Sequence, residues 1–183
     1  TVQVDDQQKV GNSKDTVDVT ITITGSNDAP VFDSAIGDQI TTGAFTENKD
    51  TTAALDAPRE LIGDIAFTDV DLTDSHAVTV TSDLVDVDGN LTSKVSLLDA
   101  KSQAITLSAA ELAAVKEAIA GSTFTPTIDL DTTKTTDSGS VHWTFSAQDQ
   151  KFDFLGEGET LTLTYTVQVD DQQKVGKDRK SVV

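Results

Sequence analysis

The acidic residues of this chain gather in tight pairs, and paired carboxylates are suited to binding hard cations. The pairs stand at the ends of segments in which apolar and polar residues alternate. Calcium takes about six to eight oxygen ligands, which carboxylates, amides and backbone carbonyls in such loops supply. Carboxylates held close together repel each other unless a cation lies between them. The paired positions are Asp5-Asp6, Asn27-Asp28, Asp69-Val70-Asp71, Asp86-Val87-Asp88 and Asp170-Asp171.

The net charge and the absence of cysteine limit which partners and metal sites the protein can have. The formal net charge is -18 and the pI is about 4.1. An acidic surface repels polyanions, so we expect no nucleic acid partner and, with no apolar run of membrane-spanning length, no direct membrane insertion. The chain has no cysteine, which excludes disulfides and thiolate metal sites. An extracellular protein without disulfides can gain stability from bound calcium instead.

Catalytic motifs are missing from the sequence. It holds no G-x-S-x-G, no H-E-x-x-H, no cysteine nucleophile and no glycine-rich phosphate loop. Of the two histidines, His142 alternates onto the polar face of a predicted strand, and His76 as a neutral imidazole is a poor calcium ligand. We therefore expect that the protein is not an enzyme.

An internal repeat organises the chain. Residues 1–11 read TVQVDDQQKVG and return unchanged at residues 166–176. Identical segments far apart are typical of tandem arrays, in which each unit contacts its neighbours. We expect residues 1–28 to be the last strands and linker of a preceding repeat. Residues 29–183 would form one repeat domain whose last strand is truncated, with neighbouring repeats of the same chain as partners.

Alternation with a period of two predicts strands as the main element. In each segment apolar residues face one way, and mostly threonine, serine or aspartate face the other. Strands of this kind form antiparallel sheets with one face in water, and several without crossover helices predict an all-β sandwich. The clearest segments are 16–24, 124–130, 141–146 and 161–169.

One short helix is expected to interrupt the strands. Ser108 and Glu111 have the spacing of a capping box, and Gly121 marks the end of the helix. The apolar stripe between them is narrow, so we expect a lid that packs on the sandwich.

Four segments, read in order, resemble the motifs of the cadherin repeat. The pairing of GETLTLTYTVQVDDQ with DVTITITGSNDAPV more closely resembles the VCBS-type, cadherin-like repeats of giant bacterial RTX-type surface adhesins. This resemblance implies an Ig/cadherin-like β-sandwich with Greek-key strand order. The four segments are Gly25-Ser-Asn-Asp-Ala-Pro-Val-Phe32, Phe45-Thr-Glu47-Asn48, Ala66-Phe-Thr-Asp69-Val-Asp71, and the stretch from Leu155 to Asp170.

The resemblance also implies calcium at both poles of the domain. Gly25 stands where the family has its first linker aspartate, which favours one or two ions at a junction over three. The N-terminal site would take Asn27, Asp28, Asp69 and Asp71, completed by Asp5 or Asp6 of the preceding unit. Half of a C-terminal site would take Glu47, Glu157 or Glu159, and Asp170.

A second candidate loop has the pattern D-x-D-G-N, with Asp86, Asp88 and Asn90 as possible ligands. It resembles the first half of an EF-hand loop. The alternative is a hairpin turn, since Asp-Gly is a common turn pair. Turn capping is also the alternative explanation for the other acidic pairs, because Asp and Asn favour turns on their own.

The function implied by the resemblance is a calcium-stiffened extender repeat of a large secreted adhesin. Such a protein is exported by type I secretion to the bacterial cell surface, outside the cell, and supports attachment and biofilm formation. The alternative is a carbohydrate- or ligand-binding module within such an adhesin. An exposed Trp143 beside a groove would favour the module, and a buried Trp143 the extender.

The spare strand near the N-terminus predicts strand exchange between molecules. Residues 16–24 have no domain of their own in this chain, and a free strand near an open sheet edge favours exchange. The linker from Gly25 to Ala29 spans at most about 18 Å, too short to return along a sandwich. We therefore expect residues 16–24 to pair with another molecule.

Overall fold

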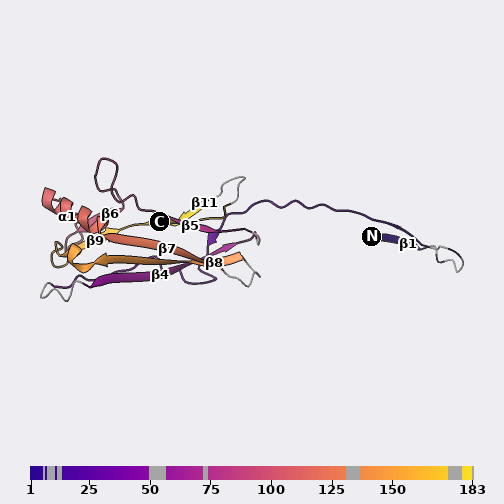
Figure 1. Ribbon diagram of the computed structural model, residues 1–183, viewed down its shortest axis with the longest axis horizontal. Coiled ribbons are helices and arrows are strands. Elements are labelled where there is room, and N and C mark those ends of the chain that lie inside the picture. The colour runs from indigo at the N-terminus through magenta and orange to yellow at the C-terminus, as the bar shows by residue number, and fades with distance from the viewer. Residues whose placement is uncertain are drawn as a thin grey trace.

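The computed structural model describes residues 1–5, 7, 11, 14–49, 57–71, 74–130, 137–172 and 179–182. Within these residues the chain is mostly β-sheet, with one α-helix and a short 3-10 helix. Figure 1 shows a body that contains nearly all of these elements and a thin N-terminal arm that extends away from it. We call residues 1–26 the arm. The β-rich architecture with one short helix confirms that part of the sequence prediction.

The longest strands form one four-stranded sheet in the order β3-β4-β8-β7. β4 and β8 pair antiparallel over their whole lengths, from Pro58 opposite Gln148 to Asp69 opposite Asp137. The predicted strands 124–130 and 141–146 lie within this sheet, as expected. Its strands are β3 (Val31–Phe32), β4 (Pro58–Asp69), β7 (Ser122–Leu130) and β8 (Asp137–Gln148).

The second layer is built around one extended stretch, residues 160–170, which comprises β9 and β10. β5 and β6 pair antiparallel with β10 and β9, and β11 pairs with β10 to give the order β11-β10-β5. The Lys94 amino group contacts both Asp83 and Thr166, so residues 82–94 bulge from one continuous edge formed by β5 and β6. The strands are β5 (Ala77–Thr81), β6 (Val95–Leu98), β9 (Thr160–Leu163), β10 (Thr166–Asp170) and β11 (Arg179–Val182).

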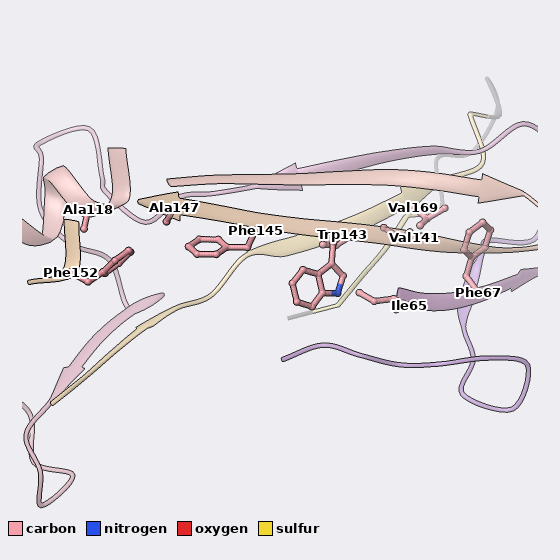
Figure 2. Close-up of a cluster of buried hydrophobic side chains, with 10 residues drawn as sticks. Ile65, Phe67, Ala118, Val141, Trp143, Phe145, Ala147, Phe152 and Val169 are labelled. Atoms are coloured by element: carbon pink, nitrogen blue, oxygen red, sulfur yellow. The ribbon is translucent and has the colours of Figure 1, made fainter. Parts of the chain in front are cut away.

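The hydrophobic core lies between the two layers (Figure 2). The alternating apolar residues of β4 and β8 meet those of β10, so each sheet buries one face. Two open sheets that share one core are consistent with an all-β sandwich. The central members are Ile65, Phe67, Val141, Trp143, Phe145, Val167 and Val169.

Trp143 is the largest side chain in this core and is held on several sides. Its indole Nε1 donates a hydrogen bond to the carbonyl of Ile40 at 2.6 Å, and its ring stacks on Phe124 with centroids 5.7 Å apart. Gly63 lies opposite Trp143 in the β4–β8 ladder. A Cβ at Gly63 would come within 2.5 Å of the indole, so only glycine leaves room for the ring.

The helix α1 (Ala109–Ala120) begins as the sequence predicts. Ser108 Oγ accepts a hydrogen bond from the Glu111 amide at 3.3 Å, and Glu111 Oε2 accepts one from the Ser108 amide at 2.7 Å. Ala118 reaches the core beside Phe152 of the 3-10 helix η2 (Asp149–Phe152). The helix therefore covers one end of the body, which confirms its prediction as a lid (Figure 1).

The arm departs from the prediction of a strand over residues 16–24. It holds a hairpin in which β1 (Val2–Asp5) pairs with β2 (Lys14–Val17), and residues 18–24 lie outside any described strand. A strand needs a hydrogen-bonded neighbour, and the β1–β2 ladder covers only Val2–Asp5 and Lys14–Val17. Their apolar side chains Val19, Ile21 and Ile23 are exposed.

We expect the substitution Gly63→Ala to destabilise the body by about 1 to 3 kcal/mol, because the added methyl group collides with the Trp143 ring. Urea unfolding followed by tryptophan fluorescence measures this directly. Gly25→Ala is the matched control, since a Cβ there meets nothing within 4 Å. Equal unfolding midpoints for the two variants would contradict the packing argument.

Candidate metal site at the base of the arm

Three aspartates converge at the pole of the body from which the arm leaves. Asp69 ends β4, Asp74 precedes β5, and Asp171 follows β10. Their carboxylate oxygens lie within 4.8 Å of one another, the one such group of three found among the described residues. The topology causes the convergence, because β5 and β10 pair antiparallel with Ala77 opposite Asp170.

The linker between arm and body is fastened to this group. Asn27 Nδ2 donates a hydrogen bond to Asp171 Oδ2 at 2.8 Å, and the Asp28 amide donates to Asp71 Oδ2 at 2.6 Å. The Asp71 amide donates in turn to Asp69 Oδ1 at 3.0 Å. The four residues that the sequence assigned to this pole thus lie near one another, but of the four only Asp69 belongs to the group of three carboxylates. Asp28 makes its contact through the backbone amide, and its side chain is exposed.

His76 lies beneath the cluster and was not assigned to it from the sequence. Its Nε2 lies 3.1 Å from Asp69 Oδ2, and its ring packs against Phe67 with centroids 5.1 Å apart. Both His76 and Asp69 are buried. His76 contacts one oxygen of Asp69 and leaves the other to face the neighbouring residues. In metal sites, a contact of this kind orients a ligating carboxylate.

The three carboxylates differ in burial. Asp69 and Asp171 are buried, Asp74 is partly buried, and His76 Nε2 lies 3.1 Å from Asp69 Oδ2. Carboxylates at this spacing in a low-dielectric setting destabilise each other unless a proton or a cation is shared. The group, with carboxylates from three separate segments, could hold a metal ion that prefers oxygen ligands.

Asp74 and Asp171 are the site residues that the sequence prediction missed. Asp74 belongs to the segment T-D-V-D-L-T-D, in which aspartate recurs at positions 69, 71 and 74. Asp171 is the second member of a pair of which only Asp170 was selected. Both patterns were visible in the sequence, but only the fold shows which carboxylates face one another.

The prediction that Asp5 or Asp6 completes this site is wrong for Asp5. Asp5 lies in the arm, where its carboxylate accepts a hydrogen bond from the Gln7 amide at 2.9 Å. Asp6 lies outside the described residues. By the internal repeat, Asp5 and Asp6 are the equivalents of Asp170 and Asp171. In the body, Asp171 of this pair lies in the group of three carboxylates.

The predicted C-terminal half-site is not formed. Asp170 lies at the N-terminal pole, where its Oδ1 accepts a hydrogen bond from Gln172 at 2.8 Å. Glu159 is in the turn that begins β9, and its carboxylate accepts one from the Gly156 amide at 2.9 Å. Glu157 is exposed in the same turn. These residues stand at opposite ends of the β9–β10 stretch, which is too long for shared ligation.

The segment containing Glu47 is anchored by an ion pair. The Asn48 amide donates to Asp149 Oδ2 at 2.9 Å, and Arg59 Nε donates to Asp149 Oδ1 at 2.7 Å. Asp149 is buried, so the guanidinium supplies the compensating charge that a cation would otherwise provide. Glu47 joins no group of three possible ligands among the described residues.

The D-x-D-G-N loop is a hairpin turn. Asp86 Oδ1 accepts hydrogen bonds from the amides of Asp88 at 3.0 Å and Asn90 at 2.7 Å, and Asp86 Oδ2 accepts from the Asn90 side chain at 3.2 Å. Gly89 has a φ of 80°, a value that glycine adopts freely. These contacts account for the residue pattern without an ion, as the turn alternative predicted.

Comparisons with protein-family models, with curated proteins and with solved structures found no match. No helix in the described part of the chain is long and apolar enough to cross a membrane.

The Asp86 turn should loosen in acid. Hydrogen bonds from Asn90 hold the pKa of the Asp86 carboxyl below its usual value. A lowered pKa means that the turn is stabilised above the usual aspartate pKa and loses that stabilisation as the pH falls through the lowered one. In an NMR titration, the Asn90 amide should shift with a midpoint below that of free aspartate. An unshifted midpoint would contradict the turn geometry.

Proposed function

We propose that this chain is a calcium-stiffened extender repeat of a large secreted bacterial surface adhesin. The observation that carries the proposal is the hydrogen bonding of the linker at the base of the arm. Asn27 contacts Asp171 of the group of three carboxylates, and the Asp28 amide contacts the neighbouring Asp71. A cation bound there would join linker and body, and would set the direction in which a preceding repeat leaves. Stiff junctions of this kind let a tandem array project from a surface.

Calcium fits the donor set better than the transition metals do. The converging ligand atoms are carboxylate oxygens, and no thiol exists in the chain. Hard oxygen ligands suit calcium and magnesium, and calcium accepts the larger and less regular coordination shell that loops provide. His76 already contacts Asp69, and its imidazole is a poor ligand for a hard cation.

The remaining parts of the proposal follow from the resemblance to VCBS-type, cadherin-like repeats. They are a Greek-key, Ig/cadherin-like strand order, export by type I secretion, and a place outside the cell on the bacterial surface. Residues 1–28 would be the end of a preceding repeat, and neighbouring repeats of the same chain the partners. Attachment and biofilm formation would be functions of the whole adhesin.

The environment of Trp143 favours the extender over a carbohydrate-binding module. Carbohydrate sites present exposed aromatic rings, whereas Trp143 is 5% exposed and its indole N–H is bonded to the backbone of Ile40. Phe124 and Tyr165 stack on each other beside it, with centroids 4.5 Å apart. The Trp143 ring is therefore part of the hydrophobic core and is not presented to a ligand.

We expect calcium to stabilise the body. Extracellular modules bind calcium with dissociation constants of about 0.1 to 1 mM, so roughly 10 mM ion adds about 1.4 to 2.7 kcal/mol per site. Scanning calorimetry in calcium and in EGTA, with magnesium at equal ionic strength, measures the shift. Equal melting temperatures in calcium and EGTA would remove the proposed site.

The substitution Asp171→Asn should abolish that calcium response, because it removes one carboxylate from the group of three. The amide oxygen still accepts the hydrogen bond from the Asn27 side chain. Asp86→Asn is the control, because it changes an aspartate outside the group and should retain the response. A calcium response that persists in Asp171→Asn would place the ion elsewhere.

Calcium should also restrict the motion of the arm. A dye attached through Thr20→Cys reports that motion by time-resolved fluorescence anisotropy, and the chain has no other cysteine. We expect the slow component of the decay to grow when calcium is added, and not to grow in Asp69→Ala. Stabilisation of the body with no change in the arm would leave a calcium site but remove its stiffening role.

A further inference from the structure

The repeated sequence folds into the same hairpin twice. In the arm Val2 lies opposite Val17, and in the body their equivalents Val167 and Val182 lie opposite each other. The correspondence extends past the identical residues 1–11, since β2 and β11 differ in sequence but hold the same register. A residue in the arm thus identifies its structural equivalent 165 positions later in the chain.

The two hairpins differ in what covers them. Val167 and Val169 are 4% and 1% exposed, because β10 also pairs with β5 and faces the core. Their equivalents Val2 and Val4 are 52% and 69% exposed. The apolar face of the arm is therefore one that the same sequence buries in the body.

The apolar face continues beyond the arm hairpin. Val19, Ile21 and Ile23 alternate with threonines and are among the most exposed large apolar residues described, with Ile23 at 89%. Threonines and β-branched apolar residues are the composition of a half-buried strand. This segment has the pattern of a strand and no described partner in the arm.

The body offers an edge in the matching position. β9 pairs with β6, and the Thr164 amide donates to the Lys94 carbonyl on that side at 2.9 Å. The other edge of β9 is in line with the edge of β10 that pairs with β11. No described strand pairs with this edge of β9. Val182, opposite Val167, is the last described pair of the β10–β11 ladder, and an incoming strand would continue that ladder along β9.

The register of the β10–β11 ladder fixes how the strand would fit. If residues 19–23 continue the register that β11 holds against β10, Val19 lies opposite Tyr165. The next two apolar pairs then lie on the same face of the sheet. The three body residues are partly buried and pack against the core, so the incoming side chains would extend that core. The two further pairs are Ile21 with Leu163 and Ile23 with Leu161.

We propose that the free edge of β9 binds residues 19–23 of a second copy of this chain as an antiparallel strand. A copy cannot fill its own edge. Asn27 is bonded to Asp171, whereas Ile23 would lie beside Leu161, about 33 Å away along the extended stretch. The residues between Ile23 and Asn27 span at most about 14 Å. The pairing involves none of the candidate metal ligands, so it stands or fails separately from the proposed function.

Disulfide trapping tests both the edge and the register. Thr22 and Thr162 would be directly opposite on the polar face, at a separation that a disulfide bridges. Thr22→Cys and Thr162→Cys proteins, one of them isotope-labelled, are mixed and oxidised, and the mixed dimer is counted by mass spectrometry. The control pairs Thr20→Cys with Thr162→Cys, which the register sets apart by two residues. We expect roughly tenfold more mixed dimer from the first pair.

Sedimentation equilibrium tests the interaction in the unmodified chain. The wild-type protein should associate with concentration, and Ile21→Asp should weaken the association roughly tenfold, because a charge cannot be buried against Leu163. Val87→Asp is the control on another fully exposed apolar residue and should behave as wild type. A wild-type monomer at millimolar concentration, or equal trapping of the two cysteine pairs, would overturn the proposal.

Discussion

The full-length antiparallel pairing of β4 with β8 is the constraint on which the other features depend. It aligns the apolar faces of the two longest strands, and it sets Gly63 opposite Trp143, so that the largest core side chain has room. The two ends of the β4–β8 ladder also position charged residues. At one end Asp69 lies at the base of the arm, and at the other Arg59 lies beside Asp149. The rigid ladder thus fixes both poles of the body at once.

The two poles handle buried negative charge in different ways. At the helix end, Asp149 is neutralised within the chain by Arg59, and its other carboxylate oxygen accepts a hydrogen bond from the Asn48 amide. At the arm end, Asp69, Asp74 and Asp171 converge, and the His76 imidazole lies against Asp69. A buried charge requires a partner, and the partner that we propose at this pole is a cation held among the three carboxylates.

The internal repeat shows one sequence in two environments. Its first strand is covered on both sides in the body and has a single partner in the arm, although the hairpin register is the same. Local sequence is therefore sufficient for the hairpin, while burial depends on neighbouring segments that the arm lacks. The exposed valines and isoleucines of the arm and the open edge of β9 are two consequences of that difference.

The local features could be predicted from the sequence because they depend on neighbouring residues. The alternation of β7, β8 and β10, the capping box at Ser108 and the turn at Asp86 are all of this kind. The placement of Asn27 and Asp69 at the same pole was implied by the resemblance to a known repeat. Three features were not predicted from the sequence. They are the pole at which Asp170 lies, the presence of Asp74 and Asp171 in the carboxylate group, and the pairing of Arg59 with Asp149. They depend on which strand ends meet, and strand order is decided by pairing between residues far apart in the chain.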